Sequence, residues 1–167
     1  IGGMAPRIHL IRQAQPSGTV LAFDAGNALG PAPLSAWDQG TTMVDLMRLA
    51  GYEALLPANH EFDYGLETLK RRRDRGGFPF LGTNLSVDDG GSAFSKSLLI
   101  ETPGPRIGVI GLLSGEAATL TNPEHFDSVE ITDPRNAAGP EIEYLQRRGA
   151  DYIIALTHMQ EEETLSF

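Results

Sequence analysis

Apolar runs and amphipathic segments alternate along the chain, and this alternation predicts the fold class. Compact apolar runs bounded by turn residues, which are typical of strands buried on both faces, occupy residues 19–23, 53–56, 78–84 and 152–156. Segments of helical character, most of them with apolar residues three or four positions apart, cover residues 5–15, 42–50, 66–75 and 138–149. The order of these elements predicts an α/β domain with a largely parallel sheet.

Turn residues divide the rest of the chain. The segment Pro103-Gly104-Pro105 separates two further apolar runs, 97–102 and 106–112, which predicts an antiparallel pair of strands. Three other segments lack a regular pattern: a loop rich in proline and glycine over residues 30–35, a turn over residues 87–92 and an irregular stretch over residues 113–133.

Composition and charge restrict the classes of protein. With 167 residues, of which 41% are hydrophobic and 21% charged, the chain is long enough for one domain, residues 1–167, with a substantial core. No apolar stretch approaches the roughly 20 residues that cross a bilayer, and the first residues contain no signal-peptide pattern. The absence of cysteine excludes disulfides and thiolate metal sites. A net charge of −9 argues against nucleic acid as a partner, and the short basic cluster at 70–75 is interpreted as a solvated helix face.

The segment Pro57-Ala58-Asn59-His60-Glu61-Phe62-Asp63-Tyr64-Gly65 concentrates the candidate chemistry. It follows a predicted strand, and open α/β sheets place their chemistry at the carboxyl ends of strands. Asn59 offers a neutral oxygen to a divalent cation, His60 can bind a metal or carry a proton, and Asp63 can orient the imidazole. A polar strand-to-helix turn has the same residue types, so the spacing alone leaves both interpretations open.

Two more predicted strands end in polar residues that are candidate ligands, Asn27 and His158. Convergence of these two with Asn59 and His60 at one sheet edge predicts an active site. The alternative for His158 is a buried, hydrogen-bonded histidine. The two remaining histidines are interpreted as surface residues without function.

Six segments follow one another in an order that a known family shares. They are Gly2-Gly3-Met4-Ala5, Asp24-Ala25-Gly26-Asn27, Asn59 to Gly65, Phe78 to Leu85, Ile107 to Leu112 and Ala155 to His158. In sequence they resemble the 5'-nucleotidase branch of the calcineurin-like metallophosphoesterases, whose signature is Gly-Asn-His-Glu-Phe-Asp-x-Gly. The resemblance covers nearly the whole chain. It implies a layered calcineurin-like metallophosphoesterase sheet with flanking helices, incomplete at both ends.

The resemblance also implies a role for each candidate residue. Members of the family hold two divalent metals and hydrolyse phosphate esters with a metal-bound water. By position, Asn59 and His158 correspond to metal ligands. His60 corresponds to the catalytic imidazole, and Asp63 to its partner in a His-Asp dyad. The substrate implied is a small phosphate ester of nucleotide type, and manganese, zinc, iron and cobalt all suit the mixed ligands.

Departures from the family pattern set a limit on that expectation. Asn27 stands where the family has its metal-bridging aspartate, and a neutral amide bridges two cations poorly. Ala58 replaces the glycine before the Asn-His pair. The family's Asp-x-His, its Gly-His-x-His or Gln segment and its C-terminal substrate-binding domain fall outside these residues. The chain is therefore expected to be a partial domain, either an interior piece of a larger protein or a gene product that has lost both ends, and to be inactive by itself.

Two functions remain open from the sequence. One is a metal-dependent phosphoesterase of 5'-nucleotidase type, and the other is a non-catalytic relative that serves as a binding or structural module with a degenerate metal centre. A Rossmann-type nucleotide-binding module is excluded, because no Gly-x-Gly-x-x-Gly follows a strand. Family members often lie in the periplasm or at the cell surface, and the compartment of this chain stays open.

Overall fold

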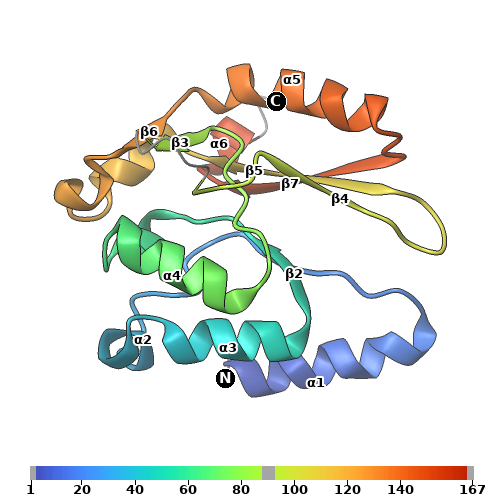
Figure 1. Cartoon of the computed structure of the whole chain (residues 1–167), viewed down its shortest axis with the longest axis horizontal. Helices are drawn as coiled ribbons and strands as arrows, with labels where there is room; N and C mark the ends of the chain where they lie inside the picture. The colour runs from blue at the N-terminus through green and yellow to red at the C-terminus, as the bar shows by residue number, and fades with distance from the viewer. Residues whose placement is uncertain (1–2, 88–92, 165–167) are drawn as a thin grey trace.

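Helices enclose the strands from two sides in the computed structural model, which describes residues 3–87 and 93–164 (Figure 1). The helices are α1 (Met4–Ala14), α2 (Pro33–Asp38), α3 (Thr41–Ala50), α4 (Leu66–Gly76), α5 (Pro134–Arg147) and α6 (Glu161–Thr164), with short 3-10 turns η1 (Gln15–Ser17), η2 (Asn59–Phe62), η3 (Gly115–Thr119) and η4 (Pro123–Phe126). The strands are β1 (Ala22–Asp24), β2 (Tyr52–Leu55), β3 (Leu85–Val87), β4 (Ser97–Ile100), β5 (Ile107–Leu113), β6 (Val129–Ile131) and β7 (Tyr152–His158). Helices α1 to α3 lie along one side of the strands and α5 along the opposite side.

The described strands pair in three groups. Strand β1 runs parallel to β2, with Asp24 opposite Leu55. Strand β5 lies between β4, to which it is antiparallel, and β7, to which it is parallel. Short strands β3 and β6 form an antiparallel pair. The α/β class and the antiparallel pair around residues 103–105 are therefore as predicted.

Residues 78–84, predicted as a regular strand, instead connect the groups of strands. Leu81 N donates to Leu55 O at 2.7 Å, so this segment extends the β1–β2 pair, and Phe80 and Leu81 form isolated parallel bridges with Leu55 and Ser95. Further on, Thr83 N donates to Gly111 O at 2.8 Å in the middle of β5. Pro79 and Leu81 bond to Leu55, and Phe80 and Gly82 bond to Ser95, so the segment lies between two partners as a strand does. Each pairing is a single bridge that does not continue, and the segment is therefore not a regular strand.

Two other expectations about local structure were wrong. The predicted loop at 30–35 contains the start of α2, where Pro33 occupies the first helical turn; proline is tolerated there because the missing N–H has no helical partner. The stretch 113–133 contains η3, η4 and strand β6, whose three residues are too few to give a pattern. The turn predicted at 87–92 lies outside the described residues from position 88 onward.

The main core cluster contains Phe62 and apolar side chains of α1, α3 and α4, whereas the buried side chains of α5 form a second, smaller cluster with β5. The Phe62 ring is fully buried and lies 4.2 Å from the Phe126 ring centroid and 6.0 Å from that of Phe94. Phe62 immediately follows the candidate residues of η2, and Phe126 belongs to η4. Packing of these rings therefore fixes the candidate motif against the segment that follows β5.

The basic cluster at 70–75 is more than a solvated face. Arg75 forms two hydrogen bonds with the Asp45 carboxylate, at 2.6 and 2.7 Å, which connects α4 to α3. Arg72 donates to the carbonyl of Gln39 at the end of α2, and Arg73 to that of Ala93. These arginines stabilise α4 against its neighbours, which makes the cluster a structural feature.

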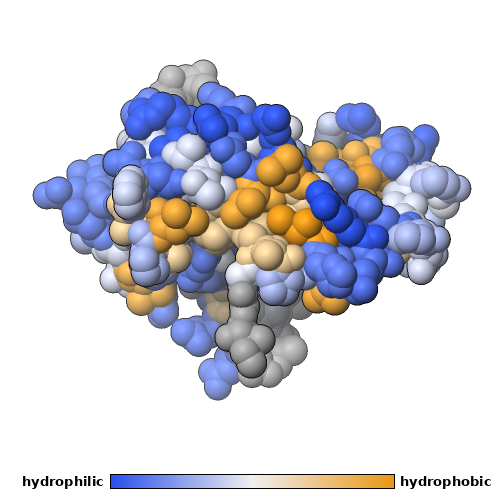
Figure 2. All heavy atoms as spheres, turned by 90° about the horizontal axis from the view of Figure 1, so that it is seen from below, coloured by the Kyte–Doolittle hydropathy of each residue, from blue (hydrophilic) through white to orange (hydrophobic). Residues whose placement is uncertain are grey.

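The helix layer of α1 to α3 carries apolar side chains on part of its outer side. Figure 2 shows apolar side chains gathered across the centre of this face. Exposed large apolar residues of these three helices are Leu10, Leu34, Trp37 and Leu49. Within the described ranges, no helix combines the length and apolar character that a membrane crossing requires.

Gly111 is predicted to tolerate no side chain. A Cβ at this position would overlap the backbone carbonyl of Leu81, which cannot move without breaking the pairing of the connecting segment. Gly111→Ala should therefore lower the free energy of unfolding by roughly 1–3 kcal/mol. Urea denaturation followed by circular dichroism measures the change. Gly115→Ala is the control, because no atom lies within 4 Å of its would-be Cβ, and equal stability of the two variants would contradict the packing argument.

Candidate active site

The Glu61 carboxylate joins the two loops that carry most of the candidate residues. Its side chain is buried, and each of its oxygens accepts two backbone hydrogen bonds. Oε1 accepts from Ala28 N at 2.7 Å and Leu29 N at 2.9 Å. Oε2 accepts from Asn27 N at 2.7 Å and Ala58 N at 2.9 Å. Three of these amides follow β1 and the fourth precedes η2, so one carboxylate ties the end of β1 to the end of β2.

Burial alters the protonation of two carboxyl groups here. Loss of hydration raises the pKa of Glu61 to about 7, although its amide donors oppose that rise. Burial also raises the pKa of Asp24 at the end of β1, where the Gly26 N–H and the Arg7 guanidinium act in the opposite direction. Both groups gain negative charge less readily than they would in water.

His60 and Asp63 form the pair that the motif predicted. Nδ1 of His60 lies 2.9 Å from Oδ2 of Asp63, and since a carboxylate accepts, Nδ1 carries the proton and donates. The other oxygen, Oδ1, accepts from the Thr121 hydroxyl at 2.8 Å. The imidazole is about one-third exposed, with a relative side-chain accessibility of 30%. Its second nitrogen, Nε2, is therefore the one left for a substrate.

Asn27 lies between His60 and His158. His158 Nδ1 is 2.9 Å from the Ala25 carbonyl oxygen, to which it must donate, so Nε2 keeps its lone pair. Nδ2 of Asn27 lies 3.5 Å from this Nε2, and Oδ1 of Asn27 accepts from His60 N at 3.4 Å. Asn27 adopts a left-handed conformation with φ of 61°, which asparagine and aspartate tolerate better than most residues.

Gly26 makes room for the residues on both sides of it. With φ of 104°, its backbone conformation favours glycine, and a Cβ there would overlap the side chain of Ala58 and lie 3.2 Å from His158 Nδ1. The methyl group of Ala58 is accommodated because Gly26 has no side chain.

Asn59 is buried, in contrast to the exposed Asn27. Its Nδ2 donates to the Leu120 carbonyl at 3.5 Å, a long hydrogen bond. Leu120 and His158 line the same hollow, whose volume is about 220 Å³; the other lining residues are Ser114, Glu116, Ala117, Thr157, Met159 and Gln160. Asn59 is thus bonded to a lining residue of this hollow but does not line it.

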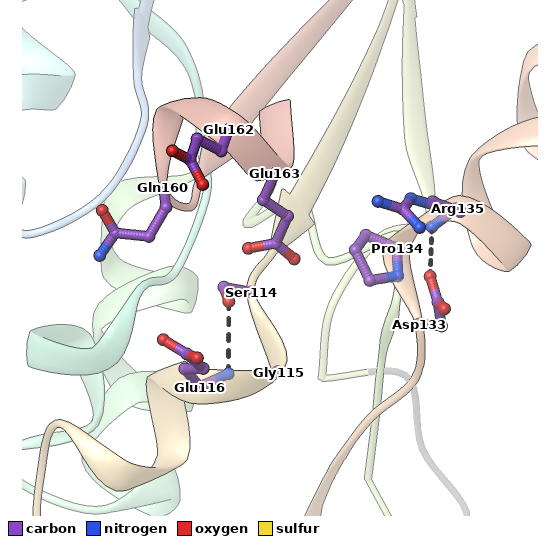
Figure 3. A pocket seen from close by; sticks show the side chains of 9 residues that line it. All are labelled: Ser114, Gly115, Glu116, Asp133, Pro134, Arg135, Gln160, Glu162 and Glu163. Atoms are coloured by element: carbon purple, nitrogen blue, oxygen red, sulfur yellow. Dashed lines mark hydrogen bonds between the residues drawn. The ribbon is translucent and has the colours of Figure 1, made fainter. Parts of the chain in front are cut away.

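A larger hollow of about 540 Å³ adjoins this one, beyond the ends of β5 and β7 (Figure 3). It is mostly acidic, with Glu116 on one wall, Asp133 at the start of α5, and Glu162 and Glu163 on α6, and Arg135 adds one positive charge. The side chains of Asp133 and Ser114 each accept a backbone hydrogen bond within their own turn, as the dashed lines show. This hollow contains none of the residues predicted for the site.

Hydrogen bonds join Asn27, His60, Asp63 and His158, although not at the edge of one sheet, whereas the side chain of Asn59 bonds to Leu120. Strands β1 and β2 belong to one pair and β7 to another group, and the two are joined by the contacts of His158 with Ala25 and Asn27.

Sequence reasoning missed the function of Glu61 as a clamp. The motif did contain a signal for this function, because a glutamate at the third position of a helical turn, as Glu61 is after Ala58, is typical of a capping box.

The two remaining histidines differ from each other. His9 is exposed on α1, as predicted. His125, predicted as a surface residue, is half-buried in η4, and its Nδ1 has no hydrogen-bond partner among the described residues.

Known proteins resemble this chain in sequence and in fold. It is 32% identical over 164 residues to the 5'-nucleotidase of Vibrio cholerae, an alignment that covers 94% of this chain and 30% of that protein. It is 34% identical over 148 residues to the silent protein UshA(0) of Salmonella typhimurium, an alignment that covers 87% of this chain and 27% of that protein. A 5'-nucleotidase precursor from Thermus thermophilus superposes with a TM-score of 0.91 at 24% identity, covering 99% of this chain and 33% of that one. The calcineurin-like phosphoesterase YfkN of Bacillus subtilis superposes with a TM-score of 0.80 at 23% identity, covering 94% of this chain and 54% of that one. No family model matches the chain.

The chain has the fold of the calcineurin-like phosphoesterases. In sequence it is similar to proteins of the 5'-nucleotidase branch, as the motifs predicted. The chain spans about a third of the length of the relatives first matched.

The branch consists of phosphoesterases that depend on divalent metals, and the described residues fit part of such a centre. The lone pair of His158 Nε2 suits a cation, whereas Asn27 directs its Nδ2 amino group to this nitrogen and its amide oxygen to His60 N. However, residues 3–87 and 93–164 contain no group of three or more histidine, aspartate or glutamate side chains that could hold a metal. The described part of the chain therefore does not complete a metal centre by itself.

Removing one oxygen from the Glu61 clamp should destabilise the fold. In Glu61→Gln, the amide group offers one oxygen, so one pair of backbone amides faces an NH₂ donor and loses its acceptor. Each unpaired buried donor costs about 1–3 kcal/mol, so for two donors we expect a loss of roughly 2–6 kcal/mol in urea denaturation. Glu67→Gln is the matched control on the exposed surface of α4 and should change stability by about 0.5 kcal/mol or less. An unchanged midpoint for Glu61→Gln would refute the clamp.

Metal affinity should respond to charge at position 27. The present donors Asn27, Asn59 and His158 are neutral, so the 167-residue chain should bind Mn²⁺ weakly in isothermal titration calorimetry. Asn27→Asp should tighten binding by roughly tenfold or more, because a carboxylate attracts the cation directly. Asn136→Asp, which adds the same charge on α5, should leave the affinity unchanged. Submicromolar binding of two ions by the unmodified chain would show that the neutral donors suffice and that charge at position 27 is not what limits affinity.

Proposed function

We propose that the protein carrying this chain is a metal-dependent phosphoesterase of 5'-nucleotidase type that hydrolyses nucleotides or related phosphate esters. The observation that supports this most is the hydrogen-bonded pair of His60 and Asp63 next to Asn27 and His158. Such an arrangement combines a proton-carrying imidazole with donors for a cation, which are the two requirements of metal-assisted phosphoester hydrolysis.

His60 is assigned the proton chemistry. Asp63 binds its Nδ1–H, which fixes the tautomer and stabilises the imidazolium, as carboxylates do in other histidine-assisted sites. Nε2 then donates a hydrogen bond to a phosphate oxygen or to the leaving oxygen when the ring is protonated. The imidazole is carried by η2, which the Glu61 clamp and the Phe62 ring hold in place.

Asn59, His158 and Asn27 are assigned to the metal centre. Bound divalent ions would supply a nucleophilic water at neutral pH and neutralise charge on the phosphate. His158 donates its Nδ1–H to Ala25 and so presents Nε2, the orientation that metal-binding histidines usually have. The remaining ligands have to come from segments outside these residues, so we expect turnover only where those segments are present.

The nucleotide substrate is inferred from the relatives. The Vibrio cholerae and Thermus thermophilus proteins are named 5'-nucleotidases, and the acidic character of the chain argues against a polymeric nucleic acid. The alternative of a non-catalytic module rests on Asn27 and on the family's ligand segments that fall outside these residues. The retained His60–Asp63 hydrogen bond favours the enzyme, because a purely structural module has no need of it.

The test is phosphate release from AMP with added Mn²⁺ by the full-length protein that carries this chain. His60→Ala should lower kcat by roughly 100-fold or more, because it removes the general acid. His9→Ala, an exposed histidine on α1, should have no effect. Turnover that survives His60→Ala unchanged would show that the chemistry resides elsewhere.

A further inference from the structure

Thr121 contacts the His60–Asp63 pair from a part of the chain that the motif does not include. Its Oγ1 donates to Oδ1 of Asp63 at 2.8 Å, across 58 residues of sequence. His60 Nδ1 donates to the other oxygen at 2.9 Å. Each oxygen of the carboxylate therefore has one donor, and the two donors come from different segments.

The segment around Thr121 is held against the motif on both sides of this contact. On one side, the Leu120 carbonyl accepts from Asn59 Nδ2 at 3.5 Å. On the other side, the Phe126 ring packs 4.2 Å from that of Phe62, next to Asp63 in sequence. The Thr121 hydroxyl is thus placed by packing and hydrogen bonds that do not depend on it.

We propose that Thr121 is a positioning residue for catalysis: its hydroxyl fixes the Asp63 carboxylate in the orientation that holds the His60 imidazole. The catalytic consequence rests on the proposed function, whereas the positioning itself rests on the contacts alone. Neither the spacing of the motif nor the resemblance to the family predicted this residue.

The physical reason is the rotational freedom of an aspartate side chain. The terminal torsion of aspartate has a broad energy minimum, so one hydrogen bond leaves the carboxylate free to turn. Asp63 is also partly exposed, with 21% relative accessibility, and water competes for its oxygens. A second donor on Oδ1 restricts that rotation, and Oδ2 then stays in line with His60 Nδ1.

Substitutions at position 121 separate the hydroxyl from the shape of the side chain. Thr121→Val keeps the branched shape and removes the hydroxyl, whereas Thr121→Ser keeps the hydroxyl and removes a methyl group. Thr121→Ala is a second variant without the hydroxyl, in case the valine variant does not fold. Thr119→Val is the matched control, because Thr119 donates only to the exposed Glu116 carbonyl in η3.

The direct test is NMR of the 167-residue chain with labelled histidine, observing the Nδ1–H proton of His60. His60→Ala assigns the signal by its disappearance. We expect Thr121→Val and Thr121→Ala to speed its exchange with water by roughly tenfold, because the carboxylate acceptor becomes mobile. Thr121→Ser and Thr119→Val should retain the original rate. An unchanged rate in Thr121→Val, or the same loss in Thr121→Ser, would overturn the proposal.

Kinetics of the full-length protein then test the consequence for catalysis. With AMP and Mn²⁺, Thr121→Val should lower kcat by roughly tenfold and leave KM within about twofold, and Thr121→Ser should restore kcat. A full-length protein without His60-dependent turnover would contradict the proposed function, and the exchange rates would still decide whether Thr121 positions Asp63. Full kcat in Thr121→Val with the exchange rate raised would overturn its catalytic role.

Discussion

The Glu61 carboxylate accepts hydrogen bonds from four backbone amides, and the arrangement of the whole site depends on this group. Without it, the loop after β1 would have three amides with no acceptor in a largely buried place. With it, Asn27 is held where its amide reaches both His60 and His158. A side chain that takes no part in chemistry thus determines the distances among those that do.

Such a clamp has an energetic cost that its geometry offsets. Burying a carboxylate removes its hydration, and this raises the pKa of Glu61 to about 7. Four N–H donors replace the lost water, two on each oxygen, so neither oxygen is left facing apolar atoms alone. The same principle recurs on a smaller scale at Asp63, where the Thr121 hydroxyl and the His60 imidazole bind one oxygen each. Both carboxylates act by fixing the groups around them.

The sequence predicted the parts of the structure that depend on local pattern. The strands that end at Asp24, Leu55 and His158 follow from apolar runs, and the motif from Asn59 to Gly65 predicted the family resemblance and the His60–Asp63 pair. Contacts between segments that are far apart in the chain leave no local pattern in the sequence, so they were not predicted. Thr121 lies 58 residues from Asp63, and residues 78–84 have the pattern of a strand although they cross between two groups of strands. Glu61 itself stands in the motif, but three of the four amides that it binds lie more than 30 residues earlier in the sequence.

Amide hydrogen exchange of the unmodified chain tests the clamp most directly. If Glu61 binds the amides of Asn27, Ala28, Leu29 and Ala58, these four should exchange as slowly as amides in the middle of β5, although the first three belong to a loop without regular structure. The amide of Gly104, which is bound only by the Thr102 hydroxyl of its own exposed turn, should exchange rapidly under the same conditions. Loop amides that exchange as fast as Gly104 would show that the carboxylate does not hold them, and the account of the site would be wrong.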